Sequence, residues 1–253
     1  HALRDGTARV FTSASKYDSL FSKAGIGNNT NVVFYGELKS KSLDAPAVAF
    51  WIFEYLGQTG KAHMLNGGLE AWTKAGKKLA TEPTIKPATT FKSKVVKSRI
   101  ATTDEVLKIA RNQAKGVQLI DSRSKKEYEG DDIRSARGGH IPNCTVNVPD
   151  ADTYDMVKDP ATGKDKSTGV LSAEKVAKVY AALDKNKRTI AYCQTGTRST
   201  LAYLELRLLG FKDPANYDDS WIIYGANDKY PITEEQRIDL SRIKKLEDEV
   251  KKL

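Results

Sequence analysis

The chain has 253 residues, of which 29% are charged and 40% hydrophobic, a composition typical of a soluble globular protein with one large or two small domains. Its formal net charge is +9, but the lysines are scattered, which indicates a solvated basic surface that attracts small anions rather than a nucleic-acid or membrane site. No apolar run is long enough for a transmembrane helix, and the sequence leaves the compartment open between cytoplasm and periplasm.

The cysteines and histidines do not form a recognisable metal or disulfide pattern. Cys144 and Cys193 are the two cysteines, and the three histidines are His1, His63 and His140. Neither their number nor their spacing matches a zinc site or a disulfide scaffold. We therefore expect no metal and no cofactor.

The first half contains a strand, a helix and a turn in succession. Residues 32–36 predict a strand, residues 47–56 predict an apolar helix that Gly57 ends, and residues 63–72 contain an Asn-Gly-Gly turn and a tryptophan. The same order of strand, loop, helix, glycine, short strand, turn and tryptophan recurs over residues 189–221. The sequence therefore predicts an internal repeat.

Residues 83–100 separate the two copies. This stretch contains proline and a run of Lys, Thr and Ser with little periodicity, which is typical of a linker. We accordingly predict a partial first domain over residues 1–82, a linker over 83–100, a second domain over 101–232 and a C-terminal helix over 233–253.

The second domain begins with a helix that Thr102 or Thr103 caps. Residues 117–120 predict a strand that ends at Asp121, residues 125–138 predict a charged, solvated loop, and residues 171–183 predict a further helix. In the tail, Thr233 and Gln236 are spaced for a capping box. Apolar side chains recur along the predicted tail helix, which we expect to pack on the protein body, an oligomer contact being the alternative; they are Ile243, Leu246, Val250 and Leu253.

A short polar loop joins the predicted strand 189–192 to the predicted helix 201–209. It reads Cys193-Gln194-Thr195-Gly196-Thr197-Arg198-Ser199, and Ser199 or Thr200 is predicted to cap the helix. A cysteine in this place faces unpaired backbone N–H groups and the positive end of the helix dipole. Gly196 lets the loop curl, and Arg198 adds a positive charge. Such surroundings favour the thiolate, so we interpret Cys193 as a covalent nucleophile rather than as a small buried hydrophobe.

Four motifs in this order resemble those of the rhodanese (thiosulfate sulfurtransferase) family. They are Asp121-Ser122-Arg123, Gly139-His140-Ile141-Pro142, the loop Cys193-x-x-Gly196-x-Arg198-Ser199, and Asp218-Asp219-Ser220-Trp221, where Asp219 replaces a family glycine. The resemblance covers about residues 100–231. It implies an α/β fold of two rhodanese-like domains, each a small, mainly parallel sheet flanked by helices, with the second domain complete and the first partial.

The first copy is expected to be inert. Gly36 aligns with Cys193 and has no side chain, and the following Glu37 would repel an anion. This copy also lacks counterparts of the early strand and of the first two motifs. We therefore expect the chain to be a fragment of a longer polypeptide, whose missing N-terminal segment is a candidate partner.

The resemblance implies a two-step reaction through a cysteine persulfide. Cys193 attacks the sulfane sulfur of thiosulfate or a similar anionic donor, sulfite leaves, and the bound sulfur passes to a thiophilic acceptor such as cyanide or a thiol. The backbone N–H groups of Gln194, Thr195, Gly196, Thr197, Arg198 and Ser199 would hold the negative charge.

Further residues have supporting roles in this interpretation. Arg198 either steers the donor or pairs internally to shape the loop. Asp121 and Arg123 are expected to form a structural ion pair, His140 to be a packed histidine rather than a base, and Trp221 to wall the site or the core. Cys144 is expected to be buried and inert.

Three alternatives stay open. Gln194 and Thr195 stand where thiosulfate-specialised members carry basic residues, so another sulfane donor, such as a persulfide, is an alternative to thiosulfate. A non-enzymatic sulfur carrier or protein-binding domain is the second. The third is a Cys-x5-Arg phosphatase, but only four residues separate Cys193 from Arg198, and Tyr192 stands where those enzymes have histidine.

Overall fold

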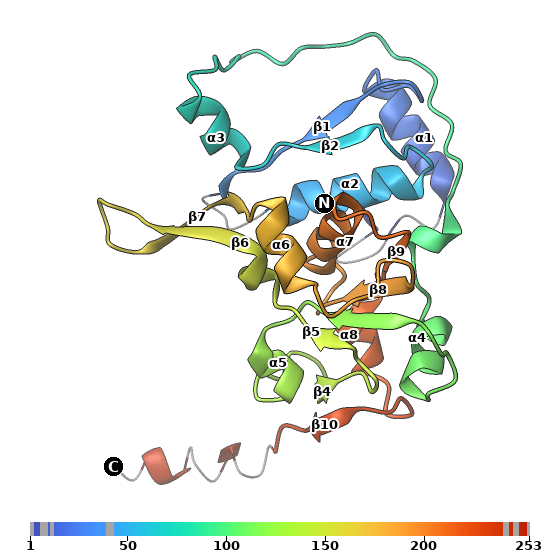
Figure 1. Ribbon diagram of the computed structural model, residues 1–253, viewed down its shortest axis with the longest axis vertical. Coiled ribbons are helices and arrows are strands. Elements are labelled where there is room, and N and C mark those ends of the chain that lie inside the picture. The colour runs from blue at the N-terminus through green and yellow to red at the C-terminus, as the bar shows by residue number, and fades with distance from the viewer. Residues whose placement is uncertain are drawn as a thin grey trace.

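The computed structural model describes residues 3–5, 10, 13–38, 43–239, 243–244 and 248–251. Figure 1 shows the small sheet of the first half at one end of the molecule and the larger sheet of the second half towards the other. Helices α2 (Asp44–Tyr55) and α7 (Ser199–Leu208) lie between the two sheets.

The larger sheet is parallel throughout and has the strand order β5-β3-β8-β9. Its central strands are β3 (Gln118–Asp121) and β8 (Arg188–Tyr192), and its outer strands are β5 (Val146–Asn147) and β9 (Asp213–Asn216). All of β3 is buried, as expected for an inner parallel strand that is covered on both faces. The predicted α/β fold with a mainly parallel sheet flanked by helices is confirmed.

The remaining elements surround these two sheets. The helices are α1 (Ala14–Lys23), α3 (Gly68–Lys74), α4 (Thr103–Ala110), α5 (Lys125–Glu129), α6 (Ala173–Val179) and α8 (Ser220–Tyr224), with short 3₁₀ helices at Lys97–Arg99 and Asp150–Thr153. The other strands are β1 (Val32–Phe34), β2 (Ala62–Met64), β4 (Gly138–His140), the hairpin β6 (Tyr154–Lys158) and β7 (Asp165–Val170), and β10 (Thr233–Gln236). As predicted, Thr102 caps α4 by accepting from the amide of Glu105.

One hydrophobic cluster spans both halves. It contains Trp51 and Phe53 of α2 together with Tyr203 and Leu206 of α7. Helix α2 is buried from Pro46 to Glu54 on every side, and a helix that is apolar all round must be enclosed by other elements. The two halves therefore share a core, while the domain boundaries drawn at residues 82 and 100 stay predictions.

The prediction for the charged segment over residues 125–138 is wrong. Residues 125–138 are not a solvated loop: Ser124 and Glu127 form a capping box on α5, and the side chains of Glu127 and Arg137 are buried. Each buried charge has partners, because Glu127 binds Arg198 and Arg137 donates to backbone carbonyls such as that of Tyr230. This charged segment of the sequence therefore contains two side chains, Glu127 and Arg137, that are buried in the fold.

The helix predicted to begin at Thr233 is also wrong. Residues Thr233–Gln236 form β10, which pairs antiparallel with β4, with Thr233 opposite His140. The backbone partners that β4 offers outweigh the local helix propensity of this segment. Of the apolar tail positions, Leu246 and Leu253 lie outside the described residues.

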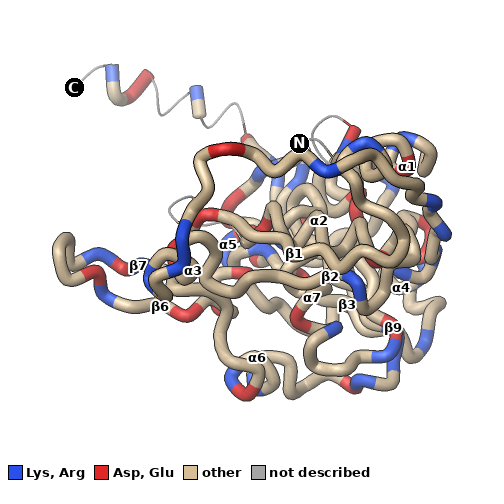
Figure 2. The backbone as a smooth tube through the Cα atoms, turned by 90° about the horizontal axis from the view of Figure 1, so that it is seen from above, with Lys and Arg blue, Asp and Glu red and all other residues tan. Residues whose placement is uncertain are grey.

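Basic and acidic positions are interspersed around the fold, and the β6–β7 hairpin carries both signs (Figure 2). The described ranges contain no helix that is long and apolar enough to cross a bilayer.

Candidate active site

Cys193 lies directly after β8, one of the two central strands, and α7 begins six residues later. Its amide donates to the hydroxyl of Ser220 over 3.1 Å, and its carbonyl accepts from the amide of Trp221 over 3.0 Å. The Sγ atom is 3.5 Å from the hydroxyl of Ser199, which in turn donates to Asn216 over 2.6 Å. The sulfur atom therefore lies against polar groups, and Cys193 as a whole is 1% exposed.

Ser199 does not cap α7, contrary to the prediction. The N-cap residue is Arg198, and no side-chain cap is made there. The hydroxyl of Ser199 instead faces Cys193 and Asn216, and that of Thr200 donates to the carbonyl of Thr197. In the first turn of α7 the amides of Thr200 and Leu201 donate to the carbonyls of Thr197 and Arg198.

The backbone amides of the loop are available to bind an anion. Among the residues that the structure describes, none accepts a hydrogen bond from the N–H groups of residues 194–199. Gly196 has a φ of 71°, and a Cβ there would come within 2.5 Å of the carbonyl oxygen of Asp218, so this turn requires glycine. Consecutive unpaired N–H groups at the start of a helix are a favourable place for negative charge.

Arg198 is held by an internal ion pair. Its guanidinium binds both oxygens of the buried Glu127 carboxylate, at 2.9 and 2.8 Å, and Asp150 lies 3.7 Å away. Burial alone would raise the pKa of Glu127, but Arg198 outweighs it and holds this pKa at about 2. Of the two roles that the sequence left open for Arg198, the structure contains the pairing that shapes the loop.

Arg4 is a contact that the sequence did not reveal. Its guanidinium donates to the carbonyl of Gly196 and to the hydroxyl of Thr197, both over 2.9 Å, and pairs with Asp218. Arg4 belongs to the first half of the chain, and no local pattern connects it with the cysteine loop. Only a long-range pairing signal could have found it.

The predicted Asp121–Arg123 ion pair forms at the end of β3, the strand that pairs with β8. The two side chains are buried and 2.6 Å apart, and Arg123 also donates to the carbonyl of Gly139 and lies 4.2 Å from the ring of Trp221. Trp221 is 1% exposed, and its indole N–H donates to the carbonyl of Arg137 over 2.9 Å. These contacts fix the strand ends on which the cysteine loop rests.

The remaining predicted residues, His140, Gln194 and Cys144, each have partners or surroundings of their own. His140 stacks on Tyr128 with ring centroids 3.8 Å apart, and its Nδ1 is 3.0 Å from the carbonyl of Tyr128, the setting of a packed histidine. Gln194 donates to the carbonyl of Arg134 over 2.7 Å. Cys144 is half-buried rather than buried as expected, but the enclosure of its thiol raises the pKa strongly, which disfavours its reactive form.

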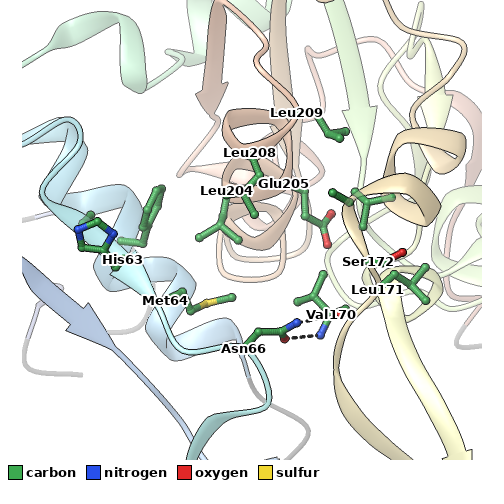
Figure 3. Close-up of a pocket in the computed structure, with 14 residues that line it drawn as sticks. His63, Met64, Asn66, Val170, Leu171, Ser172, Leu204, Glu205, Leu208 and Leu209 are labelled. Carbon is green, nitrogen blue, oxygen red and sulfur yellow. Dashed lines mark hydrogen bonds between the residues drawn. The ribbon is translucent and has the colours of Figure 1, made fainter. Parts of the chain in front are cut away.

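A separate cavity of about 370 Å³ lies between the halves (Figure 3). It is lined by α2, β2, the start of α6 and the C-terminal part of α7, and Cys193 is not among its lining residues. Glu205 lines it, and burial raises the pKa of this carboxyl to about 7 although the hydroxyl of Tyr180 donates to it. Within the described part of the chain no group of three or more His, Cys, Asp or Glu is placed to hold a metal ion.

Comparison with known proteins places this arrangement in a family. Residues 102–222 match the model of the rhodanese-like domain. A "putative thiosulfate sulfurtransferase" of Mycobacterium tuberculosis is 34% identical over 242 residues, which cover 91% of this chain and 80% of that protein. The sulfur carrier protein TtuD of Thermus thermophilus is 33% identical over 242 residues, covering 90% of this chain and 79% of TtuD.

Solved structures show the same fold. A structure of EanB, described as a persulfide in a tetrahedral intermediate state with ergothioneine, superimposes with a TM-score of 0.73 at 20% identity. The anaerobic ergothioneine biosynthesis enzyme of Chlorobium limicola gives 0.72 at 20% identity. In both cases 91% of this chain is covered, and it spans 57% of the other chain. From the ordered motifs, the fold and the identity to curated relatives, the chain belongs to the rhodanese-like family.

Proposed function

We propose that this protein is a sulfurtransferase that moves a sulfane sulfur from thiosulfate, or a similar anionic donor, to cyanide or a thiol through a persulfide on Cys193. The observation that carries the proposal is a cysteine at the end of a parallel strand, followed by a loop whose six amides are unpaired among the described residues. Such a loop can hold the charge of a persulfide as an oxyanion hole holds oxygen.

The first step transfers sulfur to the enzyme. The Cys193 thiolate attacks the outer sulfur of thiosulfate, a new S–S bond forms, and the bond to the sulfonate sulfur breaks with its electron pair, which leaves as sulfite. In the second step cyanide or a thiolate attacks the terminal sulfur of the persulfide. The S–S bond to Cys193 breaks, and the thiolate is regenerated.

The charges around the loop favour backbone amides over a side chain as the anion site. Arg198 is neutralised by its bidentate pair with Glu127, so it offers little net charge to a donor. Gln194 and Thr195 are uncharged. Because no unpaired basic side chain follows the cysteine, the donor is less narrowly specified than in thiosulfate-specialised members, and an alkyl persulfide is a second candidate.

The pairing of Arg198 also bears on the phosphatase alternative. A phosphatase loop of the Cys-x5-Arg type binds a tetrahedral phosphate with its arginine, bidentately. Here Arg198 is bound to Glu127 through two hydrogen bonds, and the loop is one residue shorter. We therefore favour sulfur over phosphoryl chemistry.

A sulfur carrier role is the second candidate, because one relative at 33% identity is named a sulfur carrier protein. A carrier would form the same persulfide but pass its sulfur to a partner protein rather than to cyanide. The two functions differ in the second step alone.

Steady-state formation of thiocyanate from thiosulfate and cyanide tests the proposal. We expect turnover by the wild-type protein, none by Cys193→Ser, and unchanged turnover by the matched control Cys144→Ser. Retained activity in Cys193→Ser would overturn the mechanism. A wild-type protein that takes up sulfur from thiosulfate but releases it to a thiol and not to cyanide would instead favour the carrier role.

A further inference from the structure

An arginine of the first half, Arg4, donates hydrogen bonds to the cysteine loop. Arg4 is 5% exposed and lies 192 positions before Gly196 in the chain. Its Nη1 is 2.9 Å from the hydroxyl oxygen of Thr197 and 3.5 Å from the carbonyl oxygen of Thr195, and its Nη2 is 2.9 Å from the carbonyl oxygen of Gly196. One guanidinium thus contacts three consecutive residues of the loop.

These contacts determine which way the loop amides face. In a trans peptide the C=O of one residue and the N–H of the next point in opposite directions, and the described residues contain no cis peptide. Holding the carbonyls of Thr195 and Gly196 towards Arg4 therefore turns the N–H groups of the two following residues to the opposite side. Those two N–H groups belong to the set that has no acceptor among the described residues.

The position of Arg4 is itself fixed. Its Nη2 is 2.5 Å from Asp218 Oδ1, and its guanidinium carbon lies 5.9 Å from the ring of Trp51. Asp218 also contacts Gly196 closely, because a Cβ on that glycine would fall 2.8 Å from Asp218 Oδ1. Asn216 adds a second donor to the carbonyl of Gly196, over 3.1 Å. The outer side of the loop is therefore clamped by groups from both halves of the chain.

We propose that Arg4 is a positioning residue of the sulfur-transfer site: it holds the carbonyls of Thr195 and Gly196 outward so that the amides of Gly196 and Thr197 face the persulfide. This inference rests on the function proposed above. The half of the chain that lacks a nucleophile then completes the active loop of the other half.

Arginine suits this task better than lysine. Its planar fork presents five N–H donors in fixed directions, whereas the lysine ammonium is a point charge with three donors on one nitrogen. A lysine at this position could pair with Asp218, but it could not also span two carbonyls and a hydroxyl. Arg4→Lys therefore keeps the charge and removes the geometry.

The test compares Arg4→Met and Arg4→Lys with the control Arg207→Met in the full chain. Arg207 also joins the halves, through Glu54 at 2.8 Å, but it lies in the last turn of α7, away from the loop. For each protein, the single-turnover rate of persulfide formation is measured by mass at saturating and subsaturating thiosulfate, together with the thermal unfolding midpoint.

We expect the saturating rate to fall roughly 10- to 100-fold in Arg4→Met, which is less than the roughly 100- to 1,000-fold loss seen when a preorganised donor is removed outright, with little change in half-saturation. Arg4→Lys should stay closer to Arg4→Met than to wild type, and Arg207→Met should lose stability but keep its rate within about twofold. A wild-type rate in Arg4→Met, full recovery in Arg4→Lys, or an equal loss in Arg207→Met would overturn the positioning role. If wild type itself takes up no sulfur, the proposed function fails, whatever the Arg4 variants do.

Discussion

The two halves of the molecule share a backbone arrangement and differ in what it displays. In the second half the carbonyl of Cys193, just after β8, accepts from the amide of Trp221 at the start of α8. In the first half the carbonyl of Gly36, just after β1, accepts from the amide of Leu69 at the start of α3. The equivalent bond is therefore made to the carbonyl of a cysteine in one half and to the carbonyl of a glycine in the other.

The halves also differ in how they support a buried acid. Glu54 of α2 accepts from the hydroxyl of Tyr203 over 2.6 Å and from Arg207 over 2.8 Å. Glu205 of α7 accepts from the hydroxyl of Tyr180 over 2.6 Å, but no arginine pairs with it among the described residues. The two halves thus share the element order β1-α2-β2-α3 and β8-α7-β9-α8, but they differ in the partners of their buried side chains.

Exchanging the nucleophile between halves should have the largest effect. We expect Cys193→Ser to lower sulfur transfer roughly 10⁴-fold or more, because the covalent step is lost. Adding Gly36→Cys to this variant should not restore activity, because the carboxylate of Glu37 beside position 36 repels an anionic donor. Thiocyanate formation measures both. Restored turnover in the double variant would show that the first half retains a working site.

Weakening the support of the active loop should be the next largest effect. Glu127→Gln removes the bidentate charged partner of Arg198 and leaves only the longer contact with Asp150, at 3.7 Å, which we expect to cost about 3 kcal/mol of unfolding free energy, in the range for breaking a buried pair. Chemical denaturation at pH 7 measures this, with the more exposed Glu129→Gln as the control. A loss below about 1 kcal/mol in Glu127→Gln would contradict the buried pair.

The same pair predicts how stability depends on pH. The pKa of Glu127 is about 2 in the folded protein against 4.5 as its ordinary value, so below pH 4.5 the unfolded state binds more protons. Its contribution is therefore complete above pH 4.5 and is lost as the pH falls towards 2. Glu127→Gln should show a shallower loss of stability than wild type across this window.

Glu205 should give the opposite pH dependence. Burial raises its pKa from 4.5 to about 7, so the folded state binds more protons than the unfolded state between these values, and stability falls as the pH rises through this window. Glu205→Gln keeps an acceptor for Tyr180 and removes the charge. We expect it to be about 3 kcal/mol more stable than wild type at pH 8 and equal at pH 4. An unchanged difference across this range, measured by denaturation, would contradict the assignment.

The smallest expected effect concerns the contact between the halves beside the cavity of Figure 3. The side-chain amide of Asn66 donates to the carbonyl of Val170 and accepts from its amide, over 3.1 and 2.8 Å. Asn66→Ala should cost about 1–2 kcal/mol of unfolding free energy, as the loss of two such bonds does. Thermal denaturation measures it, and sulfur transfer should be unchanged because Cys193 lies elsewhere.

The parts of the fold and site that were predictable are local in the sequence. The strand, loop and helix around Cys193 follow from an apolar run, a polar turn and a second apolar run, and β8 and α7 lie where this pattern placed them. Arg4 was not predictable, because its partners are more than 190 positions away. The burial of Glu127 was missed although Ser124 and Glu127 have capping-box spacing, since the surrounding charges suggested a solvated loop.

Tertiary partners account for the other errors. The segment from Thr233 has helix-forming residues, yet pairing with β4 makes it a strand. The hydroxyl of Ser199 is a good helix cap by type, but Asn216 and Cys193 are its partners in the folded chain. In both cases a partner outside the local segment decides between two locally acceptable structures.

The most direct test of the central claim is the intact mass of the protein, followed by peptide mapping, after incubation with thiosulfate. The account predicts a gain of one sulfur atom, carried by the peptide that contains Cys193, and its removal by cyanide. No mass gain, or a sulfur atom found on the peptide of Cys144, would contradict it.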